Sequence, residues 1–189
     1  MSLRVYLAGP DVFLPDPMVR AARMKTLCAA RGLVGVSPLD DLPGGDPASW
    51  ADLPEALRIA RRCEAHIGSC DVMVANLTPY RGPSADVGTV YEMGFMRALG
   101  KPVFGWSNSA CSFAARSRAF CGVSGNVDAA GMLIEDFEGM ADNLMIDGGI
   151  DASGGVFVRH EEAGDAVWTS LAAFEACLDA VSRHGPTKL

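Results

Sequence analysis

The most restrictive feature of the sequence is the nearly continuous apolar run Asp71–Leu77 in the middle of the chain. A strand that is apolar at successive positions, and not only at alternate ones, is typical of a parallel sheet covered by helices on both faces. The run is followed by a segment of loop composition, Thr78–Ser84, and then by a helical stretch that Asp86 can cap and that ends at Gly100. A strand, a loop and a helix in this order form part of a βαβ unit.

Strand-like and helix-like segments alternate along the rest of the chain. Besides the central run, the expected strands are Leu3–Ala8, Leu33–Val36, Pro102–Trp106 and the shorter Met132–Ile134, and the expected helices are Met18–Arg31, Ala51–Gly68 and Ala166–Arg183. The Pro-rich segment Ser37–Trp50 and the Gly-rich segment Gly148–Gly164 have the composition of surface connections. This alternation predicts an α/β fold with a parallel sheet of about five strands and helices on both faces. The length of 189 residues fits a single domain spanning residues 1–189.

Charge and composition argue against several classes of partner. The formal net charge of −7 is opposite to the basic face needed to bind a nucleic-acid polymer or an anionic membrane. No apolar run approaches the ~20 residues of a membrane helix, and the N-terminus lacks the basic start and apolar stretch of a secretory signal. The six cysteines form no Cys-x-x-Cys pair and no cluster with metal-ligand spacing. We therefore expect free thiols in a reducing cytoplasm and no bound metal.

The glycine motifs that hold nucleotide cofactors do not occur in the chain. The first expected strand is followed by Gly9-Pro10-Asp11 and not by G-x-G-x-x-G, and the pattern G-x-x-x-x-G-K-[ST] does not occur. In a parallel sheet of this kind, ligands bind beyond the carboxyl ends of the strands. The segments expected there are Gly9–Asp11, Asp40–Asp41, Asn76–Glu92 and Ser107–Asn108.

Within these segments, Glu92 is the strongest candidate for chemistry. It lies in the second turn of a helix among apolar neighbours, where a carboxylate is costly unless it is paired or functional. Gly88, one turn earlier, leaves open space beside it. A solvated position on the helix surface is the alternative for Glu92, and a helix cap is the alternative for Asp86. Tyr6, near the end of the first strand, is either a partner for this site or a buried core tyrosine.

Three motifs taken together resemble the nucleoside 2-deoxyribosyltransferase family. They are Val5–Pro10 (VYLAGP), Asp71–Gly82 (DVMVANLTPYRG) and Asp86–Gly94 (DVGTVYEMG), with Ala98–Val103 closing the unit and Asp142–Ile146 similar to a late Asn-Leu-Met segment. The similarity covers most of residues 3–146. It implies a doubly wound, flavodoxin-like fold.

The resemblance also implies roles for individual residues. Glu92 corresponds to the nucleophile that attacks C1′ of a 2′-deoxynucleoside, and Tyr6 to the tyrosine that orients it. Asp86 corresponds to an aspartate near the sugar 5′-hydroxyl, where a carboxylate repels a 5′-phosphate. Asn143 corresponds to an asparagine that closes the sugar site, often from a neighbouring subunit. Gly9 and Gly88 complete the expected substrate-binding set. The implied partners are a 2′-deoxynucleoside, a free nucleobase and further copies of the chain, without a cofactor.

One position departs from the family pattern. Cys63 stands where the family usually has an Asp or Asn that handles the base, and a thiol is a poor proton donor to a purine nitrogen. Glu64, Asp40 or Asp41 could substitute for it, or the base chemistry could differ. We therefore expect base exchange through a covalent deoxyribosyl–glutamate. Two alternatives remain: N-glycoside hydrolysis of deoxynucleosides or deoxynucleotides at the same site, and a non-catalytic module that senses nucleotides or metabolites.

Overall fold

The computed structural model describes residues 2–184. Its five strands form one parallel sheet in the order β2-β1-β3-β4-β5. The strands are β1 (Arg4–Ala8), β2 (Val34–Val36), β3 (Val72–Asn76), β4 (Val103–Ser107) and β5 (Phe157–Arg159). This order is the flavodoxin-like arrangement, in which the direction of winding reverses between β1 and β3. The predicted fold class is thus confirmed.

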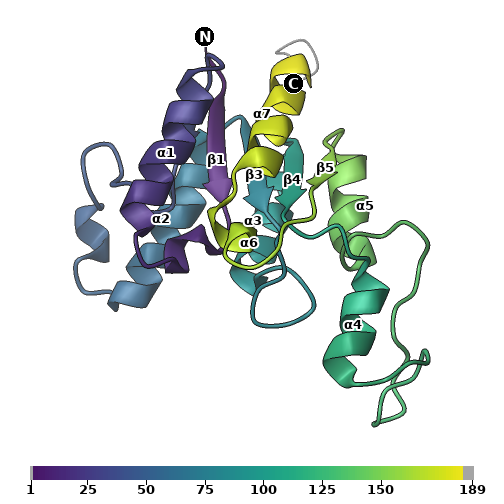
Figure 1. The fold of residues 1–189 in the computed structure, drawn as a ribbon. Helices are drawn as coiled ribbons and strands as arrows, with labels where there is room; N and C mark the ends of the chain where they lie inside the picture. The colour runs from purple at the N-terminus through teal and green to yellow at the C-terminus, as the bar shows by residue number, and fades with distance from the viewer. Residues whose placement is uncertain (1, 185–189) are drawn as a thin grey trace.

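Helices cover both faces of the sheet (Figure 1). They are α1 (Pro17–Ala29), α2 (Glu55–Ser69), α3 (Val87–Ala98), α4 (Phe113–Cys121), α5 (Leu144–Ala152), α6 (Ala166–Thr169) and α7 (Ala172–His184), with short 3-10 turns η1 (Pro10–Phe13) and η2 (Ala48–Trp50). Successive residues of a strand point to opposite faces of the sheet, so the sheet has one hydrophobic core on each face. Val5 and Leu7 pack with Met24 of α1 and Phe174 of α7, whereas Tyr6 lies in the core on the other face.

The second core contains Met73 of β3, Met93 and Met96 of α3, and Ile146 of α5. Every residue of β3 is buried, because helices cover the strand from both sides. This burial explains why Asp71–Leu77 is apolar along nearly its whole length.

The predicted fifth strand was placed wrongly. Within Met132–Ile134, Leu133 makes an isolated antiparallel bridge to Val127, outside the sheet. The actual fifth strand, β5, lies inside the Gly-rich segment predicted to be a connection. With three residues it is too short to show periodicity. Only glycine fits at position 155, just before β5, because a Cβ there would lie 1.9 Å from the carbonyl oxygen of Val103.

Three helical predictions also needed correction. The segment predicted as one closing helix is divided into α6 and α7, with Ser170 in extended backbone between them. The helix predicted from Ala51 begins at Glu55. The short helices α4 and α5 were not predicted, and α5 contains Gly148 and Gly149, which disfavour a helix locally. Figure 1 shows α4 and the segment after it projecting away from the sheet.

No helix within residues 2–184 has the length and apolar character needed to cross a membrane. Among the same residues, no group of three or more His, Cys, Asp or Glu side chains is arranged to hold a metal ion.

Candidate active site

Two of the residues predicted from sequence, Tyr6 and Glu92, meet beside β1, next to the point where the winding direction reverses. Tyr6 of β1 is fully buried, and its hydroxyl donates a hydrogen bond of 2.7 Å to Oε1 of Glu92 on α3. The two residues are 86 positions apart in the chain. A neutral phenol on a rigid central strand therefore holds the glutamate carboxyl group in one orientation.

The surroundings of Glu92 disfavour its charged form. Burial raises the pKa of Glu92 to about 7, and the nearby negative charge of Asp86 acts in the same direction. Hydrogen bonds from Tyr6 and Cys63 oppose this rise. Burial and the Glu92 charge also raise the pKa of Tyr6, so the phenol stays protonated and remains a donor. At neutral pH the carboxyl group is thus poised between its acid and base forms.

Cys63 of α2 contacts this pair directly. Its thiol lies close enough to Glu92 and Tyr6 for each to influence its pKa, which burial raises. A buried thiol with a raised pKa is neutral at physiological pH and unreactive as a nucleophile. The group that replaces the usual family Asp or Asn is therefore an uncharged neighbour of the glutamate.

The carboxylates considered as substitutes for that acid make contacts elsewhere. Glu64 accepts a hydrogen bond of 2.6 Å from the hydroxyl of Tyr91 on the exposed side of the helix pair. Asp40 pairs with Lys25 and accepts a hydrogen bond of 2.9 Å from the backbone amide of Ser37. Asp41, the next residue, is exposed. The structure thus brings Cys63 to the Tyr6–Glu92 pair, and it directs Glu64 and Asp40 to other partners.

Asp86 caps α3. One carboxylate oxygen, Oδ2, accepts hydrogen bonds from the Thr89 amide at 2.9 Å and from the Thr89 hydroxyl at 3.1 Å. A Cβ added at Gly88 would lie 3.1 Å from the same oxygen, so a larger residue there would press on the cap. The capping alternative for Asp86 is therefore real, and the capped carboxylate still lies close enough to Glu92 to raise its pKa.

Gly9 turns the chain immediately after β1. Its φ of 146° lies where residues with a side chain rarely occur, and a Cβ at Gly9 would lie 2.5 Å from Cβ of Asn76 at the end of β3. Asn76 in turn donates a hydrogen bond of 2.8 Å to Asp11. The loop after β1 therefore packs tightly against the end of β3, beside the strand that carries Tyr6.

Arg20, which sequence reasoning missed, anchors this loop. The arginine is 8% exposed, and its Nε lies 2.8 Å from Oδ1 of Asp11. Its guanidinium also donates to the carbonyl oxygens of Thr169 and Ser170, at 3.0 and 3.4 Å, where α6 ends. No local pattern in the sequence identifies such a partner, because Thr169 lies 149 positions away.

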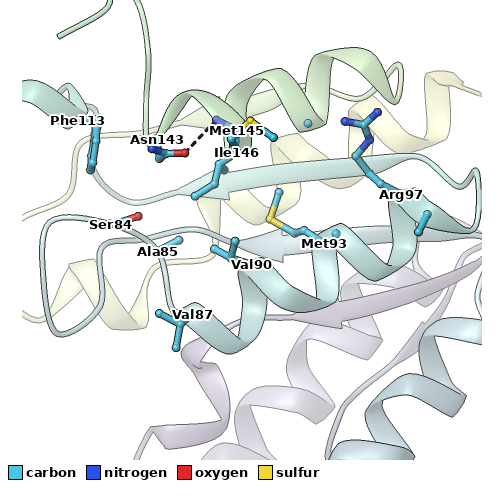
Figure 2. Close-up of a pocket in the computed structure, with 13 residues that line it drawn as sticks. Ser84, Ala85, Val87, Val90, Met93, Arg97, Phe113, Asn143, Met145 and Ile146 are labelled. Atoms are coloured by element: carbon cyan, nitrogen blue, oxygen red, sulfur yellow. Dashed lines mark hydrogen bonds between the residues drawn. The ribbon is translucent and has the colours of Figure 1, made fainter. Parts of the chain in front are cut away.

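A large cavity lies on the opposite face of α3. It has a volume of about 810 Å³ and is lined by α3, α5, Phe113 and the loop before α3 (Figure 2). Val87, Val90, Gly94 and Arg97 line it from α3. These spacings mark one stripe of a helix, and at 100° per residue Glu92 points away from that stripe. The cavity is therefore separated from the Tyr6–Glu92 pair by α3 itself.

Asn143 lines this cavity and caps α5. Its Oδ1 accepts a hydrogen bond of 3.0 Å from the amide of Met145, the contact drawn in Figure 2, and its Nδ2 donates to Glu135 at 2.7 Å. Within one chain, the structure thus places Asn143 on the other side of α3 from Glu92.

The sequence model for nucleoside 2-deoxyribosyltransferases matches residues 5–145, which include Tyr6, Asp86, Glu92 and Asn143. The chain belongs to the nucleoside 2-deoxyribosyltransferase family. An uncharacterized protein of Schizosaccharomyces pombe is 30% identical to this deoxyribosyltransferase-family chain over 195 residues, which cover 95% of this chain and 91% of that protein.

Solved structures share the fold of this family member. The 2-deoxyribosyltransferase of Leishmania mexicana is 25% identical, with a TM-score of 0.61 and coverage of 94% of this chain and 97% of that chain. A conserved protein of Enterococcus faecalis is 20% identical, with a TM-score of 0.59 and coverage of 98% and 100%. The second likeness concerns the fold alone.

Proposed function

We propose that this protein exchanges the bases of 2′-deoxynucleosides, with Glu92 as the nucleophile. The observation that carries the proposal is the buried glutamate that Tyr6 holds at 2.7 Å, at the reversal point of the sheet, in a chain of this family. Ligands of doubly wound sheets bind at this point. A raised pKa in such a position is also typical of functional carboxyl groups.

In the first half of the proposed reaction, the Glu92 carboxylate attacks C1′ of the deoxyribose. Tyr6 donates to Oε1, so Oε2 is the attacking atom. A bond forms between Oε2 and C1′ while the bond from C1′ to the base nitrogen breaks. The base leaves with that electron pair and takes up one proton. A carboxylate suits this step because it also stabilises the positive charge that develops at C1′.

In the second half, a nitrogen of the incoming base attacks C1′ and displaces the carboxylate. The incoming base releases one proton, so the two halves balance. Two displacements at the same carbon retain its configuration, as in a retaining glycosidase. The scheme requires no cofactor.

The remaining expected residues take supporting roles in this proposal. Asp86 contacts the sugar near its 5′-hydroxyl, Gly9 and Gly88 keep backbone close to the substrate, and Glu64 stays a weaker substrate-binding candidate because it bonds Tyr91. Because Asn143 lies on the far side of α3, we propose that it completes the site of a neighbouring copy in a homo-oligomer. We further propose a single domain that acts in nucleotide salvage in the cytoplasm.

The direct test is incubation of the protein with deoxyinosine and adenine, followed by chromatography of the products. Deoxyadenosine together with hypoxanthine supports base exchange. Hypoxanthine with free deoxyribose, and no deoxyadenosine, contradicts exchange and supports hydrolysis. Unchanged substrates contradict both and support a sensing role. A parallel incubation without adenine measures the hydrolytic background.

Replacing Asp86 by Ser should shift the substrate preference toward 5′-monophosphates. Serine caps a helix about as well as aspartate, so α3 should stay intact while the negative charge near the 5′ position is lost. Removing one like charge at close range should change relative kcat/KM for deoxyinosine 5′-monophosphate over deoxyinosine by roughly tenfold. Steady-state kinetics on both substrates measure this ratio. An unchanged ratio would argue against Asp86 as the discriminating residue.

The rate of exchange should rise with pH, reach half of its plateau near pH 7 and level off above about pH 8. The nucleophile must be ionised, and the pKa of Glu92 is raised to about 7. At pH 5 roughly 1% of the carboxyl groups would be charged, so kcat/KM should be about 100-fold below its plateau. In Asp86→Ser the midpoint should move to lower pH, because the Asp86 charge helps to raise this pKa. A profile that is flat between pH 5 and 7 would contradict the assignment.

A further inference from the structure

Asp142, immediately before α5, lies at the centre of a buried hydrogen-bond cluster. Its side chain is completely buried. The carboxylate accepts hydrogen bonds from the Ser84 hydroxyl, from the amides of Ala85 at 3.1 Å and Asn143 at 2.8 Å, and from Nη2 of Arg116 at 3.2 Å. Four donors from three separate parts of the chain therefore converge on one carboxylate.

Arg116 of α4 extends the same cluster. Its Nε donates to the carbonyl oxygen of Pro83 at 2.7 Å, and its Nη2 donates to that of Ala141 at 2.8 Å. Its side chain is 12% exposed. Together Arg116 and Asp142 bond three successive residues of one loop, namely Pro83, Ser84 and Ala85.

This loop leads directly into the candidate active site. Ala85 precedes Asp86, which caps α3, and α3 carries Glu92 in its second turn. Restraint of the loop therefore restrains the backbone that leads into the Asp86 cap.

The other end of the cluster is equally well anchored. Asp147 of α5 accepts hydrogen bonds from the amides of Ala141 at 3.0 Å and Asp142 at 2.8 Å. The backbone that carries the Asp142 carboxylate is thereby tied to a helix that packs in the core. Through Asp142, the loop is thus bonded to backbone that α5 anchors.

Stability alone is a weak explanation for this arrangement. A buried ion pair is often no more stabilising than apolar residues of the same size, because both charges lose their hydration. Burial accordingly raises the pKa of Asp142, although its hydrogen bonds oppose the rise. What a fully bonded polar cluster does supply is one defined geometry.

We infer that Asp142 is a positioning residue, which with Arg116 holds the Pro83–Ala85 loop so that Asp86 faces the 5′ end of the substrate. The inference rests on the proposed function for the role of Asp86. The geometric part, that Asp142 restrains the loop, stands independently of any activity.

The test is the substitution Asp142→Asn. An amide presents one acceptor and one donor group, so in either orientation its NH2 meets a donor: the Ala85 amide and Arg116 if it replaces Oδ2, or the Asn143 amide if it replaces Oδ1. We expect hydrogen exchange at the Ala85 amide, measured by NMR, to be at least ~10-fold faster. We also expect the preference for deoxyinosine over its 5′-monophosphate, as a ratio of kcat/KM, to fall at least ~10-fold. If Asp142 only stabilised the fold, the substitution would lower kcat/KM for deoxyinosine and for its 5′-monophosphate alike, and the ratio of the two kcat/KM values would stay unchanged.

Asp136→Asn is the matched control. Asp136 pairs with Arg118, another arginine of α4, but this pair is exposed and does not reach the loop. Neither readout should change in it. If Asp142→Asn does not fold, Ser84→Ala removes one of the four donors and should give a smaller change in the same direction. Unchanged exchange at Ala85 in the folded variants would overturn the inference. A parent protein with no activity, but with faster exchange in Asp142→Asn, would refute the proposed function and leave the restraint standing.

Discussion

Glu92→Ala and Glu92→Gln should each exchange bases at least ~10³-fold more slowly than the parent protein. Both substitutions remove the covalent route, since neither side chain can attack C1′ and then leave. The Gln variant keeps the size of the side chain and an oxygen that can accept from Tyr6. The measurement is the initial rate of deoxyadenosine formation from deoxyinosine and adenine. Mass spectrometry of the parent protein, mixed with deoxynucleoside and quenched in acid, should also reveal the deoxyribosyl adduct.

Two controls make this result specific to Glu92. Glu175→Gln removes a carboxylate of α7 that pairs with Arg31 on the surface, and its rate should equal that of the parent. Stability supplies the second control. Above pH 7 the charged form of Glu92 lowers the stability of the folded state, so Glu92→Gln should be more stable than the parent at pH 8 by roughly 3 kcal/mol. This difference should shrink as the pH falls from 7 toward 4.5, where Glu92 is neutral in both the folded and unfolded states. Near-normal exchange by Glu92→Gln would reject Glu92 as the nucleophile.

Arg20→Ala should lower the free energy of unfolding by about 3–5 kcal/mol. The substitution leaves Asp11, whose side chain is only 12% exposed, without its ion-pair partner, and it removes the donors to the carbonyl oxygens of Thr169 and Ser170. It also removes the guanidinium that lies 6.0 Å from the ring centre of Trp106. Unfolding in urea, monitored by tryptophan fluorescence and circular dichroism, measures the loss.

Arg31→Ala is the comparison for this prediction. Arg31 pairs with Glu175 and Asp179, whose side chains are 43% and 50% exposed, so its loss should cost about 1 kcal/mol or less. If both variants lost the same free energy of unfolding, the Arg20–Asp11 pair would contribute no more to stability than the exposed pairs of Arg31. The double variant Arg20→Met with Asp11→Asn should recover part of the stability, because it leaves no unpaired charge.

The elements with strong local signals were predicted well. β1, β3, β4 and α3 lie within or close to their predicted bounds, because alternation, apolar runs and caps act over a few residues. β5 and α5 were missed for the same reason. A three-residue edge strand has almost no pattern of its own, and the glycines of α5 are tolerated because Ile146 and Ile150 pack in the core.

The candidate site divides in the same way. Local spacing identified Glu92, Gly88 and the capping role of Asp86, since all three depend on positions along a single helix. The resemblance to the family pointed to Tyr6. The contact of Cys63, and the burial that moves the pKa of Glu92 to about 7, depend on how α2 packs beside α3.

The sequence by itself determined the class of fold and the helix that carries Glu92. Hydrophobic periodicity and helix caps depend on residues that are close together in the sequence, so they can be recognised without knowledge of the tertiary structure. Tertiary structure alone decided that Arg20 pairs with Asp11 and reaches α6, that Asp142 and Arg116 hold the loop before Asp86, and that Asn143 faces a cavity on the opposite side of α3 from Glu92. Contacts of this kind join residues far apart in the chain, and they exist only once the order of the strands has brought their elements together.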